Sequence, residues 1–128
     1  MREPCPGLVW SKARLARRAA YGAWTASAGW QARREAWHAT FVARFAAGPV
    51  CAVCGAEWSL GRGDLHHRSY DRLGHEADAD LVPVCRACHT ELHALIESSP
   101  PWRRLARPQA SDLAIAHLRR RRQHRDQP

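Results

Sequence analysis

The chain has 128 residues, and its 20 lysines and arginines outnumber its 12 acidic residues, giving a formal net charge of +8 at pH 7. This length allows one small domain with a modest core. The sequence holds no apolar run long enough to cross a membrane and starts without the apolar segment of a signal peptide, so we expect a cytoplasmic protein. The positive charge favours a polyanionic partner, but charge alone does not separate nucleic-acid binding from solubility.

The first twenty residues are expected to form a basic N-terminal arm and helix. Residues 2–7 are rich in proline, and Cys5 among them has no partner at metal-ligand spacing, so we expect a free thiol. Residues 8–20 are rich in alanine, leucine and arginine, which favour a helix. Its basic side chains either follow a phosphate backbone or form a solvated face.

Residues 21–48 are expected to form a helical lead-in. Ser27 can cap a helix that runs to about Ala47 and ends at Gly48 and Pro49. Aromatic residues recur along one face of this helix, which favours a core position over base stacking; they are Trp30, Trp37, Phe41 and Phe45. The same helix presents Arg33 and Arg34 outward as candidate nucleic-acid contacts.

Four of the five cysteines lie in two Cys-x-x-Cys pairs, Cys51/Cys54 and Cys85/Cys88. Thiolates three residues apart in a tight turn can point at one ion, and two such pairs complete a tetrahedral site for structural Zn²⁺. Disulfides are the alternative, and the absence of a secretory signal argues against them.

Histidines are placed around these pairs. Residues 64–67 alternate as in a strand, so His66 and His67 should point to opposite faces. His89 and His93 are four residues apart on an expected helix and share one face. Packed on the strand, this helix could bring three imidazoles to one ion and leave His67 free beside it. A Lewis acid next to an unligated imidazole is a hydrolytic arrangement.

The loop after the strand carries Arg68, Tyr70 and Arg72, a mix of guanidinium and aromatic groups suited to phosphate contact. An apolar second strand follows, and Pro83 within it is consistent with a sheet edge.

The C-terminal part, residues 98–128, is expected to be a linker at residues 98–101 and then a helix from Ser111 to about Gln123, capped by Ser111 or Asp112. Residues 119–122 are four arginines, either a solvated terminus or a non-specific DNA clamp.

Together these motifs resemble the HNH endonuclease family, and more narrowly its zinc-bearing ββα-metal (His-Me finger) branch of small phage and bacterial proteins. The resemblance rests on Leu65-His66-His67, on Asp80-Leu81-Val82-Pro83-Val84-Cys85-Arg86-Ala87-Cys88-His89, and on His93. It extends into the loop at residues 67–76 and, more weakly, to Tyr21, Trp24, Ser27, Trp30, Arg33 and Arg34.

The resemblance implies an α+β fold. Its centre would be a ββα-metal unit with two zinc knuckles at residues 49–97, flanked by the N-terminal helices and a C-terminal helix.

The resemblance also implies roles for single residues. His67 would be the general base that activates water, and the four cysteines would hold the structural zinc. The catalytic divalent ion (Mg²⁺, Mn²⁺, Ni²⁺ or Zn²⁺) would bind His66, His89 and His93. Asp80 stands where the family usually has an asparagine that braces the loop carrying the base. An ionised carboxylate there can only accept, so it could hold an N–H of His67; alternatively Asp78 or Asp80 approaches the metal.

The expected function is hydrolysis of DNA phosphodiester bonds, with backbone contacts and weak sequence preference, in a bacterial or phage-infected cell. A zinc-stabilised nucleic-acid-binding module without cleavage activity, partnering a phage packaging or restriction machine, is the alternative. A site-specific homing or restriction enzyme is a third hypothesis.

Overall fold

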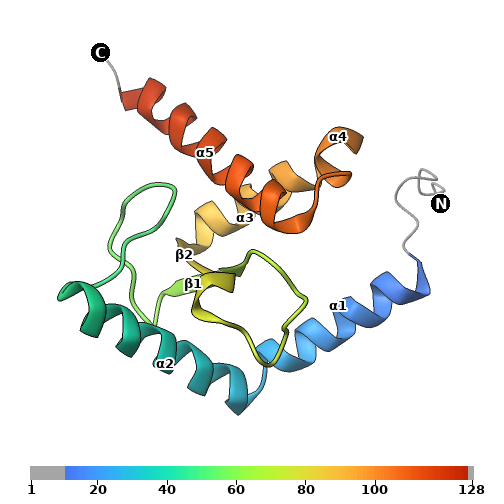
Figure 1. The fold of residues 1–128 in the computed structure, drawn as a ribbon. Helices are drawn as coiled ribbons and strands as arrows, with labels where there is room; N and C mark the ends of the chain where they lie inside the picture. Colours follow the sequence, from blue (N-terminus) through green and yellow to red (C-terminus); the bar gives the residue numbers. More distant parts are fainter. Residues whose placement is uncertain (1–10, 127–128) are drawn as a thin grey trace.

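The computed structural model describes residues 11–126, and the expected proline-rich arm with Cys5 lies outside them. Its elements are α1 (Lys12–Thr25), α2 (Ala28–Phe45), β1 (Gly63–His67), β2 (Leu81–Cys85), α3 (Arg86–Ile96), α4 (Pro100–Arg103) and α5 (Arg107–Asp126) (Figure 1). This mixture of helix and sheet is compatible with the expected α+β class. The expected boundary between residues 20 and 21 falls inside α1, which continues to Thr25.

Strands β1 and β2 form an antiparallel hairpin at the centre of the molecule, and α3 follows directly. Figure 1 shows the hairpin between α2 on one side and the pair α3 and α5 on the other. Because side chains alternate along a strand, the hairpin contributes to two separate cores. One holds Val84 with the inner faces of α3 and α5; the other holds Leu65 and Leu81 with the tryptophans of α2.

Helix α2 begins where the sequence predicts, because the Ser27 hydroxyl accepts from the Trp30 backbone N–H at 3.1 Å. Trp30 and Trp37 are buried, whereas Phe45 is 55% exposed. The aromatic face is therefore core at its start and solvent-exposed at its end. The helix ends at Phe45, before the expected Gly48 and Pro49, because Ala46 adopts the left-handed conformation (φ 54°).

Trp58 holds the first residues of β1 in place. Its ring packs edge-on against Trp37, and its Nε1–H donates to the Asp64 carbonyl at 2.8 Å. A Cβ added to Gly63 would lie 2.1 Å from the same nitrogen, so this position has room only for glycine. Trp58 thus belongs to the tryptophan core and not to the core beside the cysteines.

The C-terminal part differs from the expectation. The prolines expected in a linker begin the short helix α4, since proline suits the first turn of a helix. Helix α5 already starts at Arg107, so neither Ser111 nor Asp112 is its cap, and Ser111 is fully buried on the inner face. Among residues 11–126, no helix is long and apolar enough to span a membrane.

Candidate metal centres and basic pocket

The four paired cysteines converge on one point. The Sγ atoms of Cys51, Cys54, Cys85 and Cys88 all lie within 4.8 Å of one another, and all four thiols are free of disulfides. The knuckle that carries the first pair is tied to β2 because the Ala52 N–H donates to the Pro83 carbonyl at 2.8 Å. This cluster could hold a metal ion, as the spacing predicts.

The surroundings of the cluster act differently on its thiols: burial raises the pKa of Cys54 and of Cys88, whereas the pKa of Cys51 is lowered. The Arg122 guanidinium donates to Cys88 Sγ at 3.3 Å. Burial raises the pKa of Cys51, but the backbone N–H groups of Cys54, Cys85 and Val53 outweigh it and lower the pKa to about 7. A thiol that ionises this readily is a ready metal ligand.

Three histidines form a second cluster. One ring nitrogen each of His66, His89 and His93 lies within 4.8 Å of the others, which brings β1 and α3 together as the sequence predicts. The Nε2 atoms of His89 and His93 are 3.0 Å apart. Two nitrogens bound to one tetrahedral ion with bonds of 2.0–2.1 Å would be about 3.3 Å apart. The spacing therefore fits a shared ion.

Two polar side chains orient these imidazoles. His89 Nδ1 lies 3.1 Å from Asp64 Oδ2, and since an ionised carboxylate only accepts, Nδ1 carries the proton and Nε2 keeps its lone pair. His66 Nε2 contacts the Ser111 hydroxyl of α5 at 2.9 Å, while its buried Nδ1 has no hydrogen-bond partner among residues 11–126. A buried nitrogen without a hydrogen-bond partner fits a metal ligand at this position.

Burial keeps two of these rings, His66 and His93, neutral. Desolvation, followed by the charge of Arg107, lowers the pKa of His66 to about 2. Desolvation and the neighbouring His89 lower the pKa of His93 to about 4. Neutral imidazole is the form that binds metal.

His67 lies on the opposite face of β1, as strand alternation predicts, but it does not face solvent. It is 1% exposed, stacks on Trp30 with ring centroids 4.9 Å apart, and meets Tyr21 and Tyr70 on its other sides. The expectation of an open imidazole beside the ion is wrong in this respect, because aromatic residues from α1, α2 and the following loop enclose the ring.

The partner of His67 is Glu76. His67 Nε2 lies 2.7 Å from Glu76 Oε2, and Trp24 Nε1 donates to the same oxygen at 2.8 Å. Burial opposes ionisation of Glu76, but the hydrogen bond from His67 prevails and its pKa is lowered. The carboxylate is therefore an acceptor, so His67 carries its proton on Nε2 and the lone pair on Nδ1.

Asp80 does not contact His67. Its buried carboxylate accepts hydrogen bonds from the Arg72 guanidinium and, at 2.9 Å, from the Ala77 N–H. These bonds hold together residues of the loop between β1 and β2. The hydrogen bond from Arg72 is the main reason why the pKa of Asp80 is lowered. The suggested bond from His67 to this carboxylate is absent, since Glu76 takes that place. Neither Asp80 nor Asp78 is among the residues of the histidine cluster.

The arginines expected to bind nucleic acid have acceptors within the chain. Arg68 pairs with Asp112, with 2.8 Å between Nη2 and Oδ2. Arg33 binds Asp78 and the Glu76 carbonyl, and Arg34 donates to the carbonyls of Leu60 and Gly63. Arg33 and Arg34 are therefore not presented freely outward; a role of these side chains in binding nucleic acid stays a prediction.

A basic pocket of about 490 Å³ opens between α1, α3 and α5, and we call it the histidine pocket. Its lining includes Arg14, Arg17, Arg18 and Tyr21 of α1, Arg107 of α5, and Tyr70 from the loop expected to contact phosphate. His93 and Glu97 complete it, so one member of the histidine cluster is part of the wall. Arg107 stacks over the Tyr70 ring and donates to its hydroxyl at 2.9 Å.

Sequence patterns did not identify three residues as part of this site. Glu76 ends the loop that carries the HNH resemblance, and a carboxylate nine residues after a histidine gives no spacing signal. Arg107 and Ser111 lie on a helix whose start was expected only at Ser111. Asp64, in contrast, could have been found, because it is two residues before His66 and strand alternation places both on one face.

Comparisons of the chain with protein-family models, with curated proteins and with solved structures give no significant match.

Proposed function

We propose that this chain is a metal-dependent nuclease that hydrolyses phosphodiester bonds in DNA. The observation that carries the proposal is the position of His93. This residue belongs to a cluster of three imidazoles and at the same time lines a pocket rich in arginine. A hydrolytic ion and the phosphate that it acts on need to meet at such a place.

Two ions with different roles are proposed. Zn²⁺ at the four cysteines would be structural, because four thiolates close the coordination shell of that ion. A second divalent ion at His66, His89 and His93 would have three protein ligands and open positions, which is the pattern of catalytic sites. An ion held there would polarise a phosphate oxygen and stabilise the leaving oxygen.

The chain's own residues would bind and orient the substrate. Arg17 and Arg107 line the pocket and can donate to phosphate oxygens, and Arg107 is held in place by Tyr70. The resemblance to HNH endonucleases supports the same assignment, because the histidines stand at the positions of that family's metal ligands.

His67 would be the general base. Glu76 fixes the proton on Nε2, which leaves the unpartnered Nδ1 to accept a proton from water. Burial, opposed by Glu76, lowers the pKa of His67, so the ring is neutral at pH 7. Tyr21 and Tyr70 line the pocket and also contact this ring. The proposal therefore requires this tyrosine pair to move when substrate enters.

The burial of His67 is also the observation that favours a second function. A buried imidazole paired with a carboxylate can be purely structural, and the chain would then be a zinc-stabilised module that binds nucleic acid without cutting it. This alternative predicts DNA binding that survives His67→Ala, and no cleavage with any metal.

Nicking of supercoiled plasmid with Mg²⁺, Mn²⁺, Ni²⁺ or Zn²⁺ separates the two. We expect nicking by the wild type and by His75→Ala, a control at an exposed histidine outside the cluster. His89→Ala and His67→Ala should each lower the rate by about 10²-fold or more. Two results would contradict the proposal. One is intact plasmid with all four metals when the wild-type protein is folded, and the other is full activity of His89→Ala.

A further inference from the structure

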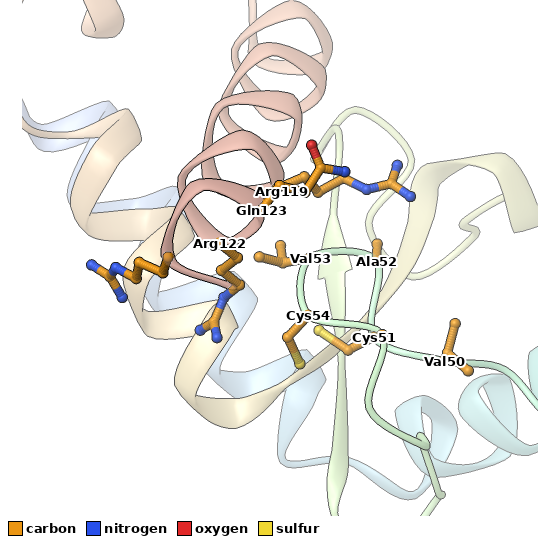
Figure 2. A pocket seen from close by; sticks show the side chains of 10 residues that line it. Val50, Cys51, Ala52, Val53, Cys54, Arg119, Arg122 and Gln123 are labelled. Carbon is orange, nitrogen blue, oxygen red and sulfur yellow. The ribbon is translucent and has the colours of Figure 1, made fainter. Parts of the chain in front are cut away.

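A second basic cleft lies beside the first cysteine pair, and we call it the knuckle cleft. It measures about 370 Å³ and lies between residues 50–55 and the last turns of α5. Arg119, Arg122, Gln123 and Arg125 of α5 line one side. Figure 2 shows Arg119, Arg122 and Gln123 extending from the helix toward the loop that carries Cys51 and Cys54. In the part of the chain that the structure describes, no acidic residue lines this cleft.

The guanidinium groups of the cleft are only partly paired. Arg122 donates to Cys88 Sγ and lies 3.6 Å from Glu91, but its buried Nε has no partner within residues 11–126. Arg119 and Arg125 are exposed, and neither makes an ion pair or hydrogen bond with any described residue. The cleft therefore offers several N–H donors that have no acceptor among the described residues.

Three positive charges gathered at one cleft repel one another. The dipole of α5 offsets this only within the last turn of the helix, and Arg119 lies earlier, about two turns before the end at Asp126. Arg122 is partly engaged by the Cys88 sulfur and by Glu91. The remaining positive charge favours a bound anion with several oxygens.

The direction of α5 links this cleft to the histidine pocket. Arg107 at the start of the helix lines the histidine pocket, and Arg125 near its end lines the knuckle cleft. The two residues are 18 positions apart, which is about five turns, so they lie on the same side of α5 and about 27 Å apart along its axis. Arg119 lies about 18 Å from Arg107 along the axis and about 120° from it around the helix. B-DNA covers these distances in about 5–8 base pairs.

We propose that the knuckle cleft binds a backbone phosphate of the same nucleic acid that enters the histidine pocket. The idea that one DNA molecule occupies both sites rests on the proposed function. The binding of nucleic-acid phosphate by the cleft is independent of cleavage. The spacing along α5 sets the second contact about 5–8 base pairs from the scissile phosphate.

The first arm of the test measures binding alone. Fluorescence anisotropy of a labelled 20-base-pair duplex, without added divalent ion, would compare the wild type with Arg119→Ala/Arg125→Ala at several salt concentrations. The matched control is Arg44→Ala/Arg62→Ala, which removes the same charge from exposed positions outside the cleft.

We expect the cleft variant to bind about tenfold more weakly or worse, and its log–log salt slope to be less steep by about 1, since one duplex phosphate contact contributes about 0.9. The control should lose less than about threefold. Wild-type affinity in the cleft variant, or equal losses in both double variants, would overturn the proposal.

The second arm keeps this inference separate from the nuclease proposal. Bis(4-nitrophenyl) phosphate carries one phosphodiester and cannot span the two sites, so the cleft variant should hydrolyse it at the wild-type rate. With plasmid DNA the same variant should show a raised KM and an unchanged kcat. If the wild type cleaves neither substrate but the binding loss persists, the nuclease proposal fails and the phosphate site in the cleft stands.

Discussion

His67 and Glu76 form a buried pair, with Nε2 and Oε2 2.7 Å apart and both side chains shielded from water. Trp24 of α1 donates to the same oxygen, so this one carboxylate joins α1 to β1. Arg33 of α2 donates to the Glu76 backbone carbonyl at 2.9 Å and adds a third element to the junction. Glu76 is thus the residue on which the N-terminal helices and the hairpin meet.

We predict that Glu76→Ala destabilises the fold by about 2–4 kcal/mol, because the buried N–H of His67 and the half-buried N–H of Trp24 lose their acceptor. Glu76→Gln keeps an acceptor oxygen and should cost clearly less. Urea unfolding measures both free energies, and Glu57→Ala, at an exposed position, serves as the control. Equal stability of Glu76→Ala and the wild type would show that the pair contributes nothing to the fold.

Metal content should depend on the cysteine cluster. We predict that Cys54→Ser releases the ion held there and lowers Tm by about 10 °C or more, because three ligands hold it far less tightly and a loss of about 3 kcal/mol corresponds to that shift. Cys54 is exposed, so the substitution removes little packing. Elemental analysis and calorimetry check the two effects. Cys5→Ser is the matched control, and a similar loss in that variant would contradict the assignment.

Substitution of Gly63 tests how tightly Trp58 packs in the tryptophan core. Gly63→Ala places a methyl group 2.1 Å from the Trp58 indole nitrogen, and we predict a loss of about 1–3 kcal/mol from the forced shift of that ring. Gly22→Ala in α1 meets no atom within 4 Å and should stabilise the helix by about 0.5–1 kcal/mol. Thermal unfolding of both variants measures the contrast. A neutral Gly63→Ala would mean that Trp58 packs loosely.

The ionisation of Asp80 should make the free energy of unfolding depend on pH. Its folded pKa is lowered, chiefly by the hydrogen bond from Arg72, so its contribution is present above the unfolded pKa of about 3.9 and is lost as the pH falls through the folded value. Because Arg72 is largely exposed, we expect Asp80→Asn to cost only about 1 kcal/mol at pH 7. The difference from the wild type should shrink below pH 4.

Urea unfolding at pH 7 and pH 3 measures this difference, and a double-mutant cycle with Arg72→Met isolates the ion pair. The same destabilisation by Asp80→Asn at both pH values would indicate a packing effect and not a charge effect.

Local spacing explains what the sequence could predict. Two Cys-x-x-Cys pairs, histidines four residues apart on a helix, and alternation along a strand each constrain a few neighbouring residues. The cysteine quartet and the grouping of His66 with His89 and His93 were therefore predictable. The start of α2 at Ser27 was predictable for the same reason, since a cap acts within one turn.

The environment of His67 was not predictable in this way. Its enclosure depends on Trp30, Tyr21 and Glu76, which come from three separate segments and meet only through tertiary packing. The partners of Arg33, Arg34 and Arg68 are likewise distant in sequence, so exposure could not be inferred from their charge. The start of α5 at Arg107 was not predicted, because a proline such as Pro108 usually indicates the end of a helix. Proline is tolerated in the first turn of a helix, where Pro108 lies.

The most direct test of the central claim, that three imidazoles hold a second ion, is metal stoichiometry after equilibrium dialysis against Zn²⁺ and separately against Mn²⁺. We predict two ions per wild-type chain with Zn²⁺, and one in His66→Ala/His89→Ala, which keeps the cysteine site. With Mn²⁺, only the histidine site should exchange its ion. One zinc per wild-type chain, or two in the double variant, would contradict the account.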